Sequence, residues 1–233
     1  MTQKSKNSSS DQQKLMIIGG VIAAAVIVAI AFIVLSSQSS LGSASIDYSQ
    51  IPQERQPDGG FVLGDPNAPV TIVAFEDFLC SHCQQYQSTI NPFIEKYVAT
   101  GMARFEYRFM PVISATYSPL VAKYTECSDT LEPGSFWKAH DVMFDLVSSS
   151  AYSNSTPETF ANRMGISYAK MLECSTEVNQ VQTDATLGQQ LGVSGTPTIM
   201  VRYGDSTPQL TQYGSQPTFE QLGMIVAAAG VGQ

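Results

Sequence analysis

Hydrophobic positions along the chain follow two patterns, one with the period of a strand and one with the period of a helix. Short apolar or alternating runs predict strands over residues 61–64, 70–75, 103–110, 198–201 and 209–213. Apolar positions three or four apart, opened by Ser, Thr or Pro, predict helices over residues 118–126 and 135–147, from 156, from 167, and over 177–191 and 219–229.

One further helix lies between the first two long strands. It should begin after residue 80 and end near Gly101, and Pro92 should kink or interrupt it. Strands 70–75 and 103–110 flank this helix. Because a strand, helix, strand connection crosses over with a right hand, we expect the two strands to be parallel.

A block of helices interrupts the strand pattern. Residues 112–191 contain five predicted helices and no predicted strand, whereas strands precede and follow the block. Its length is within the range of a subdomain. The sequence therefore predicts an α/β protein with a thioredoxin-like fold, built from residues 61–111 and 192–233, with a helical subdomain inserted at 112–191.

The first 60 residues differ from the rest. Residues 1–14 are polar and carry three lysines. Residues 15–35 are uncharged and nearly all apolar, and this run is long enough to span a bilayer as a helix, which takes about 20 residues. Because the lysines precede this run, the positive-inside rule predicts a cytoplasmic tail at 1–14, a single transmembrane anchor at 15–35 and an extracytoplasmic remainder. Residues 36–60 are rich in Ser, Gln, Gly and Pro and are predicted to be a flexible linker.

A cleaved signal peptide is the competing interpretation of the apolar run. Signal peptides have apolar regions of about 7–15 residues, and the small-residue site at 42–44 lies well beyond the run here. Under either interpretation the globular part is exported.

Composition limits the class of partner. The chain has 43% hydrophobic residues and a net charge of −8, with 12 Lys and Arg against 20 Asp and Glu. It has no basic stripe of the kind that phosphate backbones need, so nucleic-acid binding is excluded. We expect a monomer without a cofactor.

The candidate chemistry centres on Cys80-Ser81-His82-Cys83, which follows the strand at 70–75 and opens a helix. At a helix N-terminus the unpaired N–H groups and the helix dipole stabilise the thiolate of the first cysteine. Cys80 is therefore the predicted attacking thiol and Cys83 the resolving one. A structural disulfide and a metal site are the alternatives, although zinc needs four ligands and few lie nearby, so no metal is predicted.

The neighbours of the two cysteines are candidates for tuning the reaction. His82 can offer hydrogen bonds or partial positive charge to the Cys80 thiolate, which favours the reduced form and makes the disulfide a stronger oxidant. Ser81 should act more weakly on the same turn. Glu76 could carry protons for Cys83, with Asp77 less suited, although acidic residues at strand ends are more often solvated.

The other two cysteines lie in the predicted helical subdomain. Exported chains seldom leave buried cysteines free, so a structural disulfide between Cys127 and Cys174 is predicted, with two free core thiols as the alternative.

Three motifs in this order resemble the DsbA-like family of thiol–disulfide oxidoreductases, and they comprise residues 75–83, 136–141 and 192–198. The resemblance implies a thioredoxin fold with a helical insertion and a cis bond before Pro197. That bond would leave the backbone of Thr196 free to pair with an extended substrate. Many members of the family carry an acid at the position of Ala74, and this departure puts a buried-acid role in doubt.

The family resemblance also sets the predicted function and partners. It implies an oxidase that introduces disulfides into exported proteins with free thiols, and a membrane quinone-linked partner that reoxidises it. Trp137 and His140 should pack the helical subdomain against the sheet.

A disulfide reductase or isomerase, and less plausibly a metal-binding module, are the alternatives to the oxidase function. Isomerases of this superfamily usually dimerise through an added N-terminal domain, for which residues 36–60 are too short.

Overall fold

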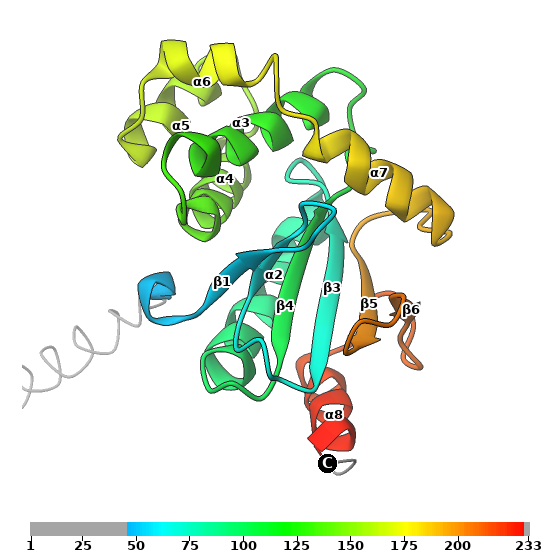
Figure 1. Cartoon of the computed structure of the whole chain (residues 1–233). Coiled ribbons are helices and arrows are strands. Elements are labelled where there is room, and N and C mark those ends of the chain that lie inside the picture. Colours follow the sequence, from blue (N-terminus) through cyan, green and yellow to red (C-terminus); the bar gives the residue numbers. More distant parts are fainter. Residues whose placement is uncertain (1–45, 231–233) are drawn as a thin grey trace, which may run out of the picture. The chain divides into compact units, whose positions relative to one another are not determined.

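The computed structural model describes residues 46–230 of the chain, and these form a six-stranded sheet with helices on both faces (Figure 1). The strands lie in the order β1-β2-β4-β3-β5-β6. Their bounds are Gln53–Arg55 for β1, Phe61–Leu63 for β2, Val70–Glu76 for β3, Arg104–Phe109 for β4, Thr198–Tyr203 for β5 and Gln209–Leu210 for β6. As predicted, β3 and β4 are parallel, and the other pairs are antiparallel.

The register of β3 and β4 decides which side chains share a face. Ala74 lies opposite Tyr107, and Glu76 lies opposite Phe109. Because side chains alternate along a strand, these residues point to one face of the sheet, whereas Phe75 points to the other.

The helix after β3 is α2, Ser81–Phe93, and it packs on the face that carries Glu76, since Gln87 of α2 donates a hydrogen bond to this side chain. Pro92 lies inside α2 without ending it. Instead the helix continues to Phe93, and the chain then changes directly to a π-helical turn, η2, at Ile94–Val98.

Five helices connect β4 to β5. They are α3 at Tyr117–Leu131, α4 at Phe136–Ser150, α5 at Thr156–Met164, α6 at Tyr168–Cys174 and α7 at Gln180–Gln190. The last of them, α7, crosses to the opposite face of the sheet from α2. Gly188 permits this close approach, because a Cβ atom there would lie 2.9 Å from Sδ of Met110 and 3.3 Å from Cδ1 of Phe75. The final helix, α8 at Phe219–Gly230, packs beside α2.

The helical subdomain joins the sheet through aromatic side chains of α4. Trp137 packs against Phe105, and the buried ring of His140 lies edge-on to Tyr107 and to Phe78 of the active turn. The sequence prediction that Trp137 and His140 pack the subdomain against the sheet is confirmed.

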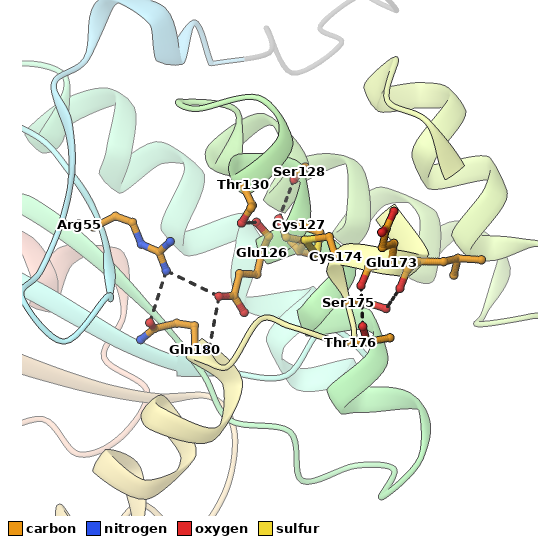
Figure 2. Close-up of a disulfide and its surroundings, with 12 residues drawn as sticks. Arg55, Glu126, Cys127, Ser128, Thr130, Glu173, Cys174, Ser175, Thr176 and Gln180 are labelled. Carbon is orange, nitrogen blue, oxygen red and sulfur yellow. Dashed lines mark hydrogen bonds and ion pairs between the residues drawn. A yellow bond between two sulfur atoms is a disulfide. The ribbon is translucent and has the colours of Figure 1, made fainter. Parts of the chain in front are cut away.

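The predicted disulfide is present in the helical subdomain. Cys127 of α3 and Cys174 of α6 are bonded, with their Cα atoms 5.9 Å apart, which is usual for a disulfide. Figure 2 shows Glu126 beside this bond. Its carboxylate forms an ion pair with Arg55 and accepts a hydrogen bond from the backbone N–H of Gln180. The bond therefore lies where α3, α6 and the start of α7 converge.

The structure differs from the prediction at the start of the domain. The segment 36–60, predicted to be a flexible linker, contains a short 3-10 helix, η1 at Tyr48–Gln50, and the strand β1. All three residues of β1 are exposed, so its sequence has no apolar pattern. The strand is held by backbone pairing with β2, by the ion pair between Glu54 and Arg104, and by the guanidinium of Arg55 over the ring of Phe61. Strand β2 is consequently an inner strand of the sheet.

Two other predicted elements are shorter than expected. The hairpin strand predicted over 209–213 pairs only at β6, after which Thr211 bridges Gly214 to close a turn. Helix α7 begins at Gln180 rather than at 177, because Glu177 and Val178 close a turn onto Cys174 instead.

The predicted tail and membrane anchor, at 1–14 and 15–35, lie outside the described residues. Within residues 46–230 no helix has both the length and the apolar character needed to cross a bilayer.

Candidate active site

The topology brings three chain segments together at one end of β3. Because β4 runs parallel to β3 and β5 runs antiparallel to it, the last residues of β3, the last residues of β4 and the first residues of β5 lie side by side at one end of the strands. The turn of residues 77–80 leads from β3 into α2 at this end. The turn therefore lies between the loop after β4 and the loop that contains Thr196 and Pro197.

Cys80 occupies the N-terminal cap of α2, where its extended backbone conformation ends the turn. Its N–H donates to the carbonyl of Asp77 over 3.0 Å, and its own carbonyl accepts from the N–H of Gln84. The thiol donates to the carbonyl oxygen of Thr196 over 3.3 Å. The Thr196–Pro197 peptide bond is cis, as the sequence predicts.

Cys83 lies one helical turn further along α2 and is fully buried. Both cysteines are free thiols in this structure. Burial raises the pKa of the Cys83 thiol well above its ordinary value, and the negative charge of Glu76 raises it further. Cys80 is buried as well, with 3% of its surface exposed, so the two sulfurs differ in position: Cys80 caps the helix beside Thr196, and Cys83 lies one turn below.

Glu76 is buried beneath this pair, with 1% of its surface exposed, and this overturns the expectation that it is solvated. Its Oε2 accepts from Nε2 of Gln87 over 3.2 Å, and Oε1 has no partner among the described residues. Burial raises the pKa of this carboxyl to about 8, against the hydrogen bond from Gln87, which lowers it. Glu76 shares its face with Ala74, the position two residues earlier in β3 at which the family resemblance leads us to expect an acid.

Asp77 is also buried rather than solvated, for a different reason. Its Oδ1 accepts from the N–H of Leu79, and its Oδ2 accepts from the N–H groups of Val112 and Ile113, each over 2.9 Å. The carboxylate thereby fastens the active turn to the loop after β4. A side chain with three backbone partners holds the turn rather than moving protons.

Ser81 and His82 occupy the first turn of α2, and both are exposed. No hydrogen bond or ion pair links the His82 side chain to another described residue, so any effect on Cys80 acts through space. Cys127 and Cys174 lie apart from the site, within the helical subdomain.

Sequence reasoning missed Gln87 as a member of the site. Its Nε2 donates both to Glu76 and to the backbone carbonyl of Cys83, over 3.2 and 3.4 Å. The available signal was spacing, because Gln87 follows Cys83 by four residues and lies on the same face of α2.

The cis-proline loop opens into a cleft of about 380 Å³. Residues from the loop, from β5 and from β6 line it, and they include Gly192, Ser194, Thr196, Pro197 and Leu210. Chemically the arrangement offers a thiol beside free backbone groups, a buried second thiol and a buried acid. Among residues 46–230 no three or more His, Cys, Asp or Glu side chains gather in a way that could hold a metal ion.

Known proteins share this fold and this order of elements. The family model described as Thioredoxin matches residues 56–224. Disulfide bond formation protein D of Bacillus subtilis is 30% identical over 149 residues, which are 60% of this chain and 66% of that protein, just under two thirds of its length.

Two solved structures agree with the family match. Oxidised BdbD from Bacillus subtilis has a TM-score of 0.60 and 25% identity, and the match covers 72% of this chain and 91% of that one. Wolbachia pipientis alpha-DsbA1 has a TM-score of 0.63 and 17% identity, and the match covers 74% of this chain and 94% of that one. At this identity the likeness supports the fold alone. The chain belongs to the thioredoxin family.

Proposed function

We propose that this chain is a DsbA-like thiol–disulfide oxidoreductase that acts as an oxidant and introduces disulfides into exported proteins. Cys80 exchanges with substrate thiols, and Cys83 is its partner in the enzyme disulfide. The observation that carries the proposal is the position of Cys80. It caps α2 with its thiol 3.3 Å from the carbonyl of Thr196, while Cys83 is buried one turn below.

The proposed cycle begins with the Cys80–Cys83 disulfide. A substrate thiolate attacks the sulfur of Cys80, the enzyme disulfide breaks, and the electron pair leaves on the sulfur of Cys83. A second substrate thiolate then attacks the substrate sulfur of the mixed disulfide and displaces Cys80. The substrate leaves with a new disulfide, and the enzyme is left as a dithiol.

Glu76 supplies the proton that the leaving Cys83 sulfur needs. A carboxyl with a pKa of about 8 is mostly protonated at neutral pH, so it can act as an acid. Gln87 links the two groups by its bonds to Glu76 and to the carbonyl of Cys83. After proton transfer the charge rests on the carboxylate rather than on a buried thiolate.

The cis-proline loop binds the substrate as an extended strand. The carbonyl of Thr196 lies beside Cys80, and the cleft bordering the loop has room for side chains that flank a substrate cysteine. Backbone pairing of this kind accepts many sequences. This suits an oxidase that acts on proteins with different cysteine contexts.

The anchor at 15–35 would hold the catalytic domain at the outer surface of the membrane, with residues 1–14 in the cytoplasm. The uncharged apolar run, preceded by lysines, supports an exported, tethered protein. The reduced enzyme then returns its electrons to a quinone-linked membrane partner, which the anchor keeps nearby.

Oxidative refolding of a reduced, unfolded ribonuclease tests the proposal. The oxidised wild-type protein should restore ribonuclease activity, whereas Cys80→Ala should restore none. The double variant Cys127→Ala/Cys174→Ala is the matched control, because it removes two cysteines outside the site and should retain oxidase activity. Refolding by Cys80→Ala at the wild-type rate would contradict the proposal.

A further inference from the structure

Three of the buried polar atoms near the active turn have no hydrogen-bond partner among residues 46–230. They are Oε1 of Glu76, the hydroxyl oxygen of Tyr107 and Nε2 of His140. Each belongs to a side chain that is at most 1% exposed. Because an unsatisfied polar atom is costly inside a protein, buried atoms that no protein group reaches are typically satisfied by ordered internal water.

The side chains that carry these atoms follow one another across one face of the sheet. Tyr107 of β4 shares this face with Glu76, because its register partner Ala74 lies two residues before Glu76 in β3. The ring of His140 lies edge-on to that of Tyr107, with the two centroids 4.9 Å apart. Both rings also pack against Phe78 of the active turn. The row therefore leads from the redox pair to helix α4 of the subdomain.

The hydroxyl of Tyr107 senses the charge of the redox site. Burial raises the pKa of Tyr107 well above its ordinary value, and negative charge on Glu76 and on Cys83 raises it further. The phenol therefore keeps its proton. A neutral hydroxyl both donates and accepts a hydrogen bond, so it can pass a proton between two neighbours without becoming charged itself.

His140 connects this buried row to a carboxylate at the surface. Its Nδ1 lies 3.0 Å from Oδ1 of Asp141. Since a carboxylate oxygen can only accept, we assign the hydrogen to Nδ1, which leaves Nε2 as an acceptor on the buried side. The side chain of Asp141 is 35% exposed, and its Oδ2 accepts from the hydroxyl of Tyr48 over 2.7 Å. Asp141 is thereby held in place while it remains in contact with solvent.

We propose that buried water connects Glu76, Tyr107 and His140 into a proton path that reaches solvent at Asp141. The inference deepens the proposed oxidase function and rests on it. Tyr107 and His140 are positioning residues, because they act on the sulfur chemistry only through Glu76. The path runs through the helical subdomain, so it stays open while a substrate covers Cys80.

The path restores the proton that Glu76 gives away. When the enzyme disulfide is reduced, Glu76 protonates the leaving sulfur of Cys83 and becomes a carboxylate. With a pKa of about 8, this carboxyl takes up a proton again at neutral pH. One proton enters at Asp141, each group along the path accepts one and releases one, and the hydrogen of the imidazole is left on Nδ1 of His140. The reverse transfer removes the proton from Glu76 before Cys83 is oxidised again, and no electron moves along the path.

Stopped-flow reduction of the oxidised protein by dithiothreitol at pH 7 tests this. Acid quench follows the sulfur exchange, and a pH indicator in weakly buffered solution follows proton uptake. In the wild type the two should have the same rate. In Tyr107→Phe and in Asp141→Asn, uptake of one proton should lag roughly tenfold behind the exchange measured in the same variant, as when one hydrogen-bonded step of a proton path is lost.

Each variant keeps the shape of its side chain, and each has a matched control. Tyr124→Phe removes the hydroxyl of another buried tyrosine, whose pKa responds to Tyr168 rather than to the redox site. Asp145→Asn removes a carboxylate one turn after Asp141 on α4, where it pairs with Arg163. In both controls exchange and proton uptake should have the same rate, as in the wild type.

Equal rates of exchange and uptake in Tyr107→Phe and Asp141→Asn would overturn the path. A lag in the wild type, or the same lag in the controls, would overturn it as well, because a general loosening of the fold has no reason to separate protons from sulfur exchange at these two positions. A wild-type disulfide that dithiothreitol cannot reduce would instead refute the proposed exchange at Cys80, on which the path rests.

Discussion

Glu76 and Cys83 form a pair of buried groups whose protonation states depend on one another. Negative charge on Glu76 raises the pKa of Cys83, after the larger effect of burial. The Glu76 carboxylate and the Cys83 thiolate therefore destabilise each other, and the favoured state has one proton on one of the two groups. This pairing gives the buried cysteine a proton source although water cannot reach it.

Glu76→Gln should slow substrate oxidation, because glutamine keeps the shape and a hydrogen bond but has no proton to give. We expect a loss of roughly ten- to a hundredfold at pH 7. The ratio of wild-type to variant rates should fall as pH rises through about 8, where the wild-type carboxyl also loses its proton. Stopped-flow rates with dithiothreitol across this range measure the ratio, and a constant ratio would exclude the proton-donor role.

His82→Ser should make the enzyme disulfide less oxidising. The exposed His82 lies between the two cysteines in the sequence. Under the tuning hypothesis its imidazole stabilises a negative sulfur through space, so its removal would weaken the reduced form. We expect the reduction potential to fall by on the order of 30 mV, equivalent to about 1.4 kcal/mol for two electrons. Equilibration with glutathione measures it, Ser88→Ala on the same helix is a control, and an unchanged potential would refute the tuning role.

At the residue scale, the sequence predicts correctly the residues whose role follows from a short local motif. It predicts wrongly the residues that are buried by segments distant in the sequence. The cysteine pair, the cis bond before Pro197 and the Cys127–Cys174 bond follow from short motifs and from cysteine usage. The burial of Glu76 requires Gln87 of a neighbouring helix. The burial of Asp77 requires N–H groups 35 and 36 residues away, which no local pattern indicates.

At the scale of elements, the disulfide joins two helices of the subdomain that also pack against each other. It joins α3 to α6, which is a short helix of the subdomain, across 47 residues of sequence. Glu126, next to Cys127, connects the same place to β1 and α7 through Arg55 and Gln180 (Figure 2). The bond therefore stabilises the subdomain without touching the redox turn.

Cys127→Ala/Cys174→Ala should lower the free energy of unfolding by about 2–4 kcal/mol, because the open chain gains the entropy of an unclosed loop. The reduction potential of the Cys80–Cys83 pair should not change. Urea unfolding measures the first quantity and glutathione equilibration the second. A shifted potential would mean that the subdomain and the redox turn are coupled.

Strand and helix patterns predict most elements, but backbone pairing and buried charge decide the rest. Strand β1 contains no apolar residue, so no hydrophobic pattern predicts it. Helix α7 packs over a buried charge network in which Arg108 bonds Glu106 and Asp184, and Arg202 pairs with Glu106. In the sequence these charges resemble the solvent-facing side of an alternating strand, although both faces of β4 are covered.

At the scale of the whole molecule, the buried carboxyls set how stability changes with pH. Burial raises the pKa of Glu76 to about 8 and that of Glu126 to about 7. Between the ordinary pKa of about 4.5 and these values, the folded protein retains protons that the unfolded chain has released. Stability therefore falls as pH rises through this window and levels off above it.

The dithiol form of the wild-type protein should lose stability between pH 5 and pH 8, and Glu76→Gln should lose less. For this residue alone the difference at pH 8 is on the order of 3–5 kcal/mol in favour of the variant, and it should vanish near pH 4.5. Urea unfolding at a series of pH values measures both curves. Parallel curves would show that Glu76 titrates alike in the folded and unfolded states.

The reduction potential of the Cys80–Cys83 pair tests the central claim most directly, because it decides whether the molecule gives or takes disulfides. An oxidant with Cys80 at a helix N-terminus and His82 beside it should have a potential above about −180 mV when equilibrated with glutathione. A potential near −270 mV, like that of thioredoxin, would mean that the same site works as a reductant and would contradict the account.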